Sequence, residues 1–599
     1  MRRDKGQNSK RFTAKMQSSL LFVFCIVFLC FLALVVRLVY LNNKDGDKYE
    51  RRVLAQQTYV SSAIPFKRGN ILDRNMTKLA VSEKVYNLTL DPVGILEKSE
   101  NKKETIQALN QCFEISKEEL ETILEKHNNS RYFLVQDHKG LEYDKVSVFK
   151  KMQEKNKKIV GVYFEEEYIR KYPLKNIGSN VIGFTQKGNG NIGTWGIEEF
   201  YNDELNGTNG REYGYFDAEL NLERTVKGAV DGHNIISTID ANVQAIVEKK
   251  VEKFLDETGA ENLAVLVMNP QNGEIYSMVS NYSFDLNDPR NLEPFYSKKK
   301  LKKMSDEEYG EALSKLWRNY CISDAYEPGS TFKPFTVAAA LDEAKATNKS
   351  SYVCNGASVV AGQRIRCNKT HNTVSLKQSL MMSCNVAMMD IAAKMGKSVF
   401  ADYLKMYGFG AKTGIDLPGE GTGLIFTEDQ LGPVQLATSS FGQSNTVTMV
   451  QLASGFCSLI NGGNYYKPHI VKEIQNENGA TIKAIGPTLV KETISESASE
   501  KIRNYLFATV EAGTAKSAGV EGYEIGGKTG TAETQPRKQG NYLVSFIGFT
   551  PIEDPQVVTY VIIDRPHVDH QANSGYATEL ASDIMKDILP FLGVYPTKE

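Results

Sequence analysis

AYEPGSTFKPF, residues 325–335, places Ser330 three positions before Lys333 in an otherwise apolar run. A proline-glycine pair predicts a turn before the serine, and the residues after it predict a helix that tolerates Pro334 in its first turn. Because residues three positions apart share a helix face, the Ser330 hydroxyl and the Lys333 amine are expected to meet. A lysine whose ammonium form is disfavoured by burial or by a nearby cation can activate a serine, whereas a helix cap beside a surface lysine shows the same short pattern.

Two further short motifs follow along the chain. MMSCNVAMM, residues 381–389, holds Ser383 and Asn385 two positions apart, and GGKTGTAET, residues 526–534, holds Lys-Thr-Gly at 528–530. Glycines before and within the last motif allow a substrate backbone to lie close against a strand. Each motif alone is weak, but the order S-x-x-K, S-x-N, K-T-G in one chain strongly indicates one active site.

The sequence around these motifs predicts an α+β layer arrangement from about residue 231 onward. Residues 262–280 are typical of two strands around an Asn-Gly turn, and residues 542–550 and 557–564 of a second strand pair. Apolar residues at helical spacing from 580 to 588 predict a terminal helix. Strands at both ends of a helix-forming segment indicate one sheet whose first and last parts meet.

Residues 45 to about 230 have a different composition, rich in Lys, Glu and Asn. VYNLTL, residues 85–90, predicts a strand, and ISKEELETILEKH, residues 115–127, predicts a charged helix. No cluster of residues in this region is typical of a catalytic site. We therefore expect an elongated, non-catalytic α+β region.

The N-terminus is typical of a membrane anchor. Residues 1–15 are strongly basic, and LLFVFCIVFLCFLALVV, residues 20–36, contains no polar side chain. This run spans about 25 Å as a helix, and Arg37 and Tyr40 can extend it by snorkelling and interfacial anchoring. A cleaved signal peptide usually has a shorter apolar core and a small-residue cleavage site, which this stretch lacks. The sequence predicts an uncleaved anchor, with a buried core helix as the alternative.

The overall charge gives no indication of a surface for nucleic acid. The 599 residues carry 71 basic and 72 acidic side chains, a formal net charge of −1, and the length predicts several domains. The basic run KKKLKK at 298–303 is interpreted as a solvated loop. We therefore expect no nucleic-acid partner.

The ordered motifs resemble those of the penicillin-recognising serine enzymes, which include the penicillin-binding proteins and the serine β-lactamases. Further stretches resemble class B penicillin-binding proteins. KRGNILDRN (67–75), RKYPLKNIGSNVIGFT (170–185) and GTWGIEEFYNDELNGTNG (193–210) are similar to three blocks of their non-catalytic pedestal, and WRNYCISDAYEPGSTFK (317–333) is also similar to that class. Asn75 departs from the usual glycine, but asparagine also tolerates a left-handed turn.

This resemblance implies a membrane-anchored α+β protein. The expected parts are a cytoplasmic tail at 1–18, a transmembrane anchor at 19–40, a dimerisation-type pedestal at 41–230 and a penicillin-binding transpeptidase domain at 231–599. The last part is expected to be an antiparallel sheet flanked by helices, like that of the serine β-lactamases. The protein would cross the bacterial cell membrane once, with its N-terminus in the cytoplasm and its catalytic domain outside.

The resemblance also implies a role for each motif residue. Ser330 would attack the D-Ala-D-Ala peptide bond of a cell-wall stem peptide, and Lys333 would accept the Ser330 proton as general base. Ser383 would relay the proton to the leaving D-alanine, and Lys528 would keep Lys333 neutral by like-charge repulsion. An amine of a neighbouring stem peptide would then attack the acyl-enzyme, at which β-lactams would stall.

Substrate binding is expected at Asn385, Lys528, Thr529, Gly530 and Thr531. Asn385 would hold the substrate amide, Lys528 and Thr529 would grip the terminal carboxylate, and the backbone N–H groups of Ser330 and Thr531 would form the oxyanion hole. The chemistry requires no cofactor. Expected partners are stem peptides, β-lactams, the membrane, a glycosyltransferase and other membrane proteins of cell-wall synthesis.

Two other functions remain as alternatives. A β-lactamase or a β-lactam sensor of the same fold would carry all three motifs, but a β-lactamase is usually a single secreted domain, so the pedestal and the anchor favour the transpeptidase. A mainly scaffolding role in the cell-wall machinery is disfavoured by the intact motifs. The sequence leaves open whether the enzyme serves septal, elongation or spore cell-wall synthesis.

One more pattern precedes the second motif. Cys354, Cys367 and His371 follow C-x12-C-x3-H in a chain with only eight cysteines. These residues suit zinc, with a fourth ligand from Cys384, an acid or water, and zinc would cross-link the loop that leads into the S-x-N helix. A Cys354–Cys367 disulfide and unpaired thiols are the alternatives, since the pattern lacks the C-x2-C pair of standard zinc fingers.

Overall fold

The computed structural model describes residues 14–57, 60–186, 189–216 and 222–596, which form two compact units. The first unit comprises residues up to Pro65 together with Asn209–Ala229. It contains α1 (Ala14–Gln57) and an antiparallel sheet of β1 (Val60–Ile64), β8 (Gly210–Phe216) and β9 (Leu222–Lys227). Helix α1 includes Leu21–Tyr40, which is long and apolar enough to cross a membrane and coincides with the predicted anchor. Most of the predicted cytoplasmic tail lies outside the described residues.

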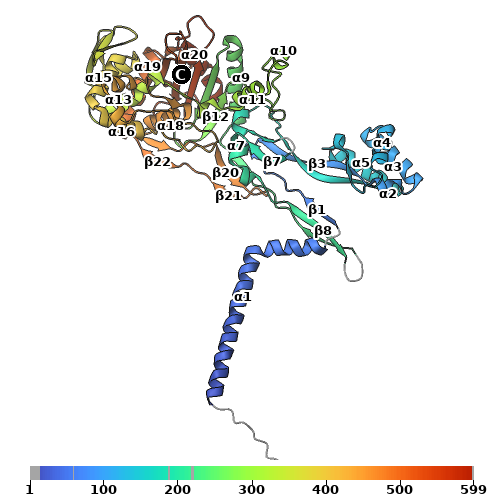
Figure 1. Cartoon of the computed structure of the whole chain (residues 1–599). Coiled ribbons are helices and arrows are strands. Elements are labelled where there is room, and N and C mark those ends of the chain that lie inside the picture. The colour runs from blue at the N-terminus through green and yellow to red at the C-terminus, as the bar shows by residue number, and fades with distance from the viewer. Residues whose placement is uncertain (1–13, 58–59, 187–188, 217–221, 597–599) are drawn as a thin grey trace, which may run out of the picture. The chain divides into compact units, whose positions relative to one another are not determined.

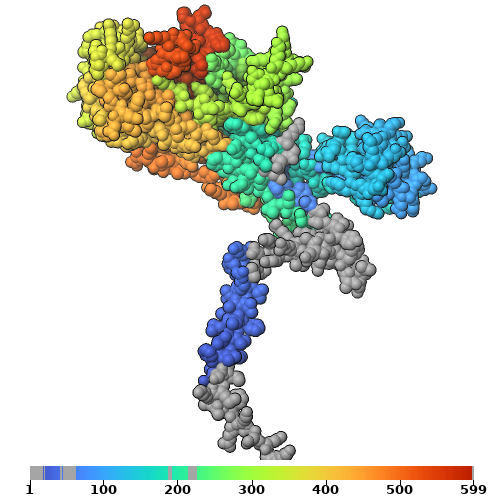
Figure 2. Space-filling view, in the orientation of Figure 1, coloured from blue at the N-terminus to red at the C-terminus, as the bar shows by residue number. Residues whose placement is uncertain are grey.

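The second unit holds the remaining residues and begins with a seven-stranded sheet. Its longest strands, β3 (Lys78–Leu90) and β5 (Val162–Lys171), form an antiparallel ribbon that leads to a lobe of helices, drawn in blue in Figures 1 and 2. The lobe contains α2 (Pro92–Leu96), α3 (Ser99–Phe113), α4 (Lys117–Lys126) and α5 (Tyr143–Lys155). The strand predicted at 85–90 and the helix predicted at 115–127 are confirmed.

Strands from both halves of the chain build this sheet. Its order is β21-β20-β10-β2-β3-β4, with β5 also paired to β3. The remaining strands are β2 (Ile71–Leu72), β4 (Phe133–Leu134), β10 (Asn234–Ser237), β20 (Val471–Gln475) and β21 (Thr481–Ala484). Strand β10 follows the domain boundary predicted at 230/231 and pairs with β2, which precedes it, so one continuous sheet includes residues from both sides of this boundary. The position of the boundary stays a prediction.

The three pedestal blocks of the sequence converge on one buried carboxylate. Glu198 of the third block accepts hydrogen bonds from Arg68 Nε of the first at 2.8 Å and from Arg170 Nε of the second at 2.6 Å. Tyr172 Oη donates to the same carboxylate at 3.1 Å. Burial alone would raise the pKa of Glu198, but the two guanidiniums hold it below its usual value. Loss of either arginine would leave part of a buried charge unpaired.

A five-stranded sheet forms the core of the C-terminal half. Its order is β12-β11-β25-β24-β23, and every pairing is antiparallel. The strands are β11 (Asn262–Met268), β12 (Ile275–Ser280), β23 (Gly526–Glu533), β24 (Tyr542–Thr550) and β25 (Val557–Asp564). Gly273 turns the chain between β11 and β12 with a φ of 81°, and Val265 of β11 lies opposite Val561 of β25. The predicted hairpin, the second strand pair and the meeting of the first and last strands are therefore confirmed.

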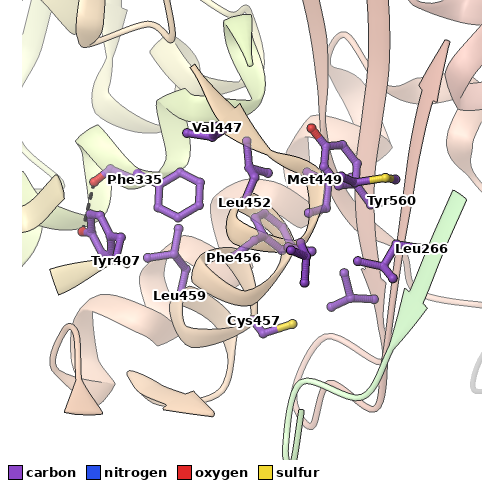
Figure 3. Close-up of a cluster of buried hydrophobic side chains, with 14 of the residues drawn as sticks. Leu266, Phe335, Tyr407, Val447, Met449, Leu452, Phe456, Cys457, Leu459 and Tyr560 are labelled. Carbon is purple, nitrogen blue, oxygen red and sulfur yellow. Dashed lines mark hydrogen bonds between the residues drawn. The ribbon is translucent and has the colours of Figure 1, made fainter. Parts of the chain in front are cut away.

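Helices cover both faces of this sheet, as the α+β prediction requires. Helix α9 (Ala241–Thr258) and the predicted terminal helix α20 (Gly575–Ile588) pack on one face. Helix α18 (Met449–Ile460) is buried along its whole length on the other. Figure 3 shows Phe456 of α18 between Phe335 on the helical side and Leu266 on the sheet side.

One local prediction is wrong. The composition of the basic run at 298–303 predicts a solvated loop, but Lys298–Leu301 form the short helix α10. Ser297 caps this helix by accepting a hydrogen bond from the Lys300 N–H, and lysine is itself a good helix former. The lysine side chains are exposed, as expected for solvated charges.

Candidate active site

The three motifs meet beside β23, at the edge of the five-stranded sheet. Ser330 lies in the 3-10 turn η2, Lys333 begins α13, and Ser383 lies in the turn between α14 and α15. Turn η2 packs against β23, and α13 packs against α14 and α15. The bounds of these elements are η2 (Gly329–Phe332), α13 (Lys333–Asp342), α14 (Leu376–Met381) and α15 (Asn385–Met395).

Lys333 is fully buried and bonds to the second motif. Its Nζ donates to Ser383 Oγ at 2.9 Å and to the Ser383 carbonyl oxygen at 2.6 Å. Among the residues that the structure describes, no hydrogen bond joins Lys333 to the half-buried Ser330 hydroxyl. The structure therefore shows a Lys333–Ser383 pair, and the expected meeting of the Ser330 hydroxyl with the Lys333 amine stays a prediction.

Burial changes the protonation of both motif lysines. Removal from water lowers the pKa of Lys333 to about 8. The pKa of Lys528 falls well below its usual value, first because of burial and second because of the positive charge on Lys333. The like-charge repulsion between the two lysines was expected to lower the pKa of Lys333. In the structure it lowers the pKa of Lys528. Because burial brings the pKa of Lys333 to about 8, a neutral amine is accessible at this lysine near neutral pH.

Close packing explains the glycines of the first and third motifs. A Cβ on Gly530 would lie 2.3 Å from Ser545 Oγ of β24, closer than real Cβ atoms approach. A Cβ on Gly329, which has a φ of 57°, would lie 2.5 Å from the Thr531 carbonyl oxygen. The second contact places Gly329, the residue before Ser330, against the backbone of Thr531; Ser330 and Thr531 are the pair expected to form the oxyanion hole.

The S-x-N turn has an unusual backbone. Ser383 adopts a φ of 56°, in the left-handed region that few serines occupy. Asn385 Nδ2 donates to the Arg366 carbonyl oxygen at 3.2 Å, and the Asn385 N–H donates to Cys367 Sγ at 3.2 Å. The expected role of Asn385 in holding a substrate amide stays a prediction.

Thr514 joins the second and third motifs, and the sequence did not single it out. It follows helix α19 (Glu496–Ala512), and its Oγ1 lies 3.3 Å from Thr529 Oγ1. Its N–H donates to the Met381 carbonyl oxygen at 3.2 Å. Lys528 Nζ also donates to Thr529 Oγ1 at 3.3 Å. A Gly-Thr pair after a helix is too common in sequences to indicate such a position.

A salt bridge links the segments on either side of the site. Arg537 Nη2 lies 2.8 Å from Glu327 Oε2, and Glu327 Oε1 accepts the Ser444 N–H at 3.1 Å. Glu327 precedes the turn with Ser330, while Arg537 lies in the loop after β23. Neither residue belongs to a short motif, so the sequence carried no signal for their pairing.

The three predicted metal ligands lie together, and Cys384 joins them. Cys354, Cys367, His371 and Cys384 each place one sulfur or nitrogen atom within 4.8 Å of the others. The three cysteines are unpaired in the structure, so the alternative Cys354–Cys367 disulfide is not formed in it.

Comparisons with known proteins agree with this architecture. Residues 63–237 match the penicillin-binding protein dimerisation domain, and residues 263–586 match the penicillin-binding protein transpeptidase domain. The chain is 35% identical to stage V sporulation protein D of Bacillus subtilis (strain 168), over 97% of this chain and 86% of the relative. It is 26% identical to the probable peptidoglycan D,D-transpeptidase PenA of Neisseria meningitidis serogroup A, over 96% of this chain and 93% of the relative.

Among solved structures, penicillin-binding protein 2X of Streptococcus thermophilus is similar, with a TM-score of 0.75 and 25% identity. The similarity covers 90% of this chain and 81% of that structure. Fold and site together define a transpeptidase of bacterial cell-wall synthesis. The chain belongs to the class B penicillin-binding proteins.

Proposed function

We propose that this transpeptidase cross-links peptidoglycan stem peptides through an acyl-enzyme on Ser330. Ser330 Oγ attacks the carbonyl carbon of the D-Ala-D-Ala peptide bond, and its proton moves to the neutral amine of Lys333. The proton passes through Ser383 Oγ to the departing nitrogen, the C–N bond breaks, and D-alanine leaves. An amine of a neighbouring stem peptide then attacks the ester carbon and forms the cross-linking amide, the bond between that carbon and Ser330 Oγ breaks, and the proton that this amine loses returns to Ser330 Oγ.

The buried Lys333–Ser383 pair carries this proposal. A general base works best when its pKa lies near the operating pH, and burial brings the pKa of Lys333 to about 8. The 2.9 Å hydrogen bond from Lys333 Nζ to Ser383 Oγ supplies the next step of the proton path. Ser330 lies three residues before this lysine, in turn η2, which runs directly into α13.

Substrate binding is proposed along β23. The Lys528 ammonium and the Thr529 hydroxyl would hold the terminal carboxylate, with Thr514 as a further hydroxyl donor beside Thr529. Lys528 would regain its proton when the carboxylate arrives, because an adjacent anion stabilises the ammonium form. The N–H groups of Ser330 and Thr531 would stabilise the oxyanion. One such donor lowers the activation barrier by about 3 to 4 kcal/mol.

The lifetime of the penicillin adduct tests the proposal against the alternatives. We expect fluorescent penicillin to label the purified full-length chain stoichiometrically and the ester to persist for hours. We also expect a peptide ending in D-Ala-D-Ala to release D-alanine and to appear, by mass spectrometry, joined to an added acceptor amine. Rapid turnover of penicillin would identify a β-lactamase instead, and a folded protein without any labelling would support a scaffold.

The rate of acylation is expected to depend on pH. Only the neutral amine of Lys333 can accept the Ser330 proton, and its pKa lies at about 8. The second-order rate constant for penicillin should therefore rise about tenfold per pH unit between about pH 5.5 and 7 and level off above the pKa of this lysine. Stopped-flow measurements at constant ionic strength would check this, and a rate independent of pH across that range would contradict the role of Lys333.

We further propose a single membrane crossing by α1, with the basic N-terminus in the cytoplasm and the catalytic domain outside. The apolar stretch Leu21–Tyr40 and the basic residues before it support this orientation. A glycosyltransferase that makes the glycan strands is the proposed partner, along with other membrane proteins of cell-wall synthesis. The name of the Bacillus subtilis relative favours spore cell-wall synthesis as the process served.

A further inference from the structure

A groove leads away from the candidate active site across one end of the five-stranded sheet. Strand register places Glu533 of β23 beside Tyr542 of β24. Leu543, the next residue, lies opposite Asp564 of β25, and Asp564 lies opposite Asn262, the first residue of β11. Because neighbouring strands are about 4.8 Å apart, the distance from β23 to β11 along this end of the sheet is about 14 Å.

Three adjoining cavities form this groove. The first, of about 300 Å³, is lined by Glu533 at the end of β23 and by residues on either side of it. It shares Tyr320 and Asp324 with a second cavity of about 390 Å³. The second cavity shares Asn281 and Lys315 with a third of about 610 Å³. The shared residues connect the end of the substrate-binding strand to the third cavity.

The third cavity lies between two helices and a loop. The helices are α9 and α11 (Asp306–Trp317), both drawn in green in Figure 1, and the loop is 281–297, which follows β12. Trp317 Nε1 donates to the Pro289 carbonyl oxygen at 2.8 Å, which ties the loop to α11. The volume of this cavity lies within the range of about 300 to 1,000 Å³ that is typical of sites for small molecules.

The lining of the third cavity combines aromatic rings with hydrogen-bond acceptors. The rings of Tyr282 and Phe295 are partly exposed, and their centroids lie 6.1 Å apart. Asp285, Asp288 and Asn291 line the same cavity and are exposed. An aromatic ring can cover the apolar C–H face of a sugar, while carboxylate and amide oxygens accept hydrogen bonds from sugar hydroxyls and from an N-acetyl N–H. These groups therefore suit an N-acetylated sugar.

Charges of both signs lie along the groove. Arg565 Nη1 lies 2.8 Å from Glu261 Oε2, and Arg318 Nε lies 2.7 Å from Asp324 Oδ2. Lys315 adds a cation where the second and third cavities adjoin. A strongly basic protein segment would prefer a surface of one sign, whereas an uncharged, hydroxylated ligand can bind among mixed charges.

We propose that this groove binds the substrate beyond its reacting bond and that the third cavity takes an N-acetylated sugar of the glycan strand that carries the donor stem peptide. The inference rests on the proposed function, in which the terminal carboxylate lies at Lys528 and Thr529 and the reacting carbonyl lies at Thr531. An extended donor peptide then runs antiparallel to β23 and leaves this strand near Glu533.

The length of the donor matches this path. Roughly four residues separate the reacting carbonyl of a stem peptide from the sugar, and they span about 13 Å when extended. The stem peptide accordingly crosses the first cavity, and the sugar to which it is attached, together with the next sugar of the strand, reaches the second and third cavities. The groove would thus favour donors that are already part of a glycan over free peptides.

A comparison of two substrates tests the sugar site. The probes are a synthetic N-acetylated disaccharide that carries a stem peptide ending in D-Ala-D-Ala, and the same peptide without sugars. We expect the full-length wild type to release D-alanine from the disaccharide probe with a kcat/KM at least about tenfold higher. Equal values for the two probes would overturn the proposal.

Two aromatic residues of the third cavity localise the effect. Tyr282→Ala and Tyr296→Ala should each reduce the ratio of the two kcat/KM values to near one, since both side chains line this cavity. Tyr163→Ala is the matched control, because Tyr163 is an exposed tyrosine of β5, and it should keep the wild-type ratio. Thermal unfolding midpoints check that the variants are folded. A sugar preference that persists in both cavity variants would place the sugar elsewhere and overturn the assignment.

Binding to Ser330→Ala separates the sugar site from the chemistry. This variant lacks the proposed nucleophile, so isothermal titration calorimetry can measure the dissociation constants of both intact probes. We expect the disaccharide probe to bind at least about tenfold more tightly. Tighter binding of this probe without D-alanine release by the wild type would count against the proposed function alone. An oligolysine peptide that binds in place of the disaccharide probe, and whose binding Tyr282→Ala abolishes, would assign the groove to a basic partner and overturn the proposal.

Discussion

Replacement of Ser330 by alanine is expected to abolish covalent labelling by penicillin. The substitution removes the oxygen that would form the ester but leaves Lys333, Ser383 and β23 in place. Labelling of the full-length chain should fall by more than about 10³-fold, to the background of the gel, because no other group can replace a missing nucleophile. Fluorescent penicillin followed by denaturing electrophoresis measures the effect.

Ser454→Ala provides the matched control for this experiment. Ser454 is a buried serine of α18, and its loss should leave labelling unchanged. Equal thermal unfolding midpoints for the two variants would show that the loss at Ser330 is chemical. Persistent labelling of Ser330→Ala would mean that another residue carries the acyl group.

Lys333→Arg is expected to be nearly as damaging as Lys333→Ala. Arginine keeps a positive charge and hydrogen-bond donors, but it cannot lose its proton in a protein. If Lys333 is the general base, both variants should acylate about 10²- to 10⁴-fold more slowly than the wild type. Stopped-flow acylation at pH 8 would compare them.

Chemical rescue separates the loss of the base from the strain of a larger side chain. Lys333→Ala leaves space beside Ser383 Oγ, so a small alkylamine in the buffer should restore part of its acylation rate, with more rescue at higher pH. Lys333→Arg fills this space and should show no rescue. A rate for Lys333→Arg within tenfold of the wild type would indicate that Lys333 only donates hydrogen bonds.

Local sequence patterns were sufficient for most of the secondary structure around the site. The hairpin at Gly273, the strands β24 and β25 and the terminal helix α20 follow from side-chain periodicity and turn residues, which act over a few positions. The helix at Lys298–Leu301 has the same local origin, since the Ser297 side chain caps its N-terminus. The meeting of the first and last strands was also predictable, because exposed edges of apolar strands must be paired.

The order of the three motifs by itself singled out the principal residues of the candidate site, and a single long apolar run singled out the anchor. Only the tertiary structure revealed that Lys333 bonds to Ser383, that Thr514 contacts Thr529 and that Cys384 completes the cysteine–histidine cluster. These contacts join segments whose relative positions depend on how helices pack on a sheet. Motifs record which side chains occur and in what order, whereas distances between segments far apart in the chain are decided by the packing of the whole core.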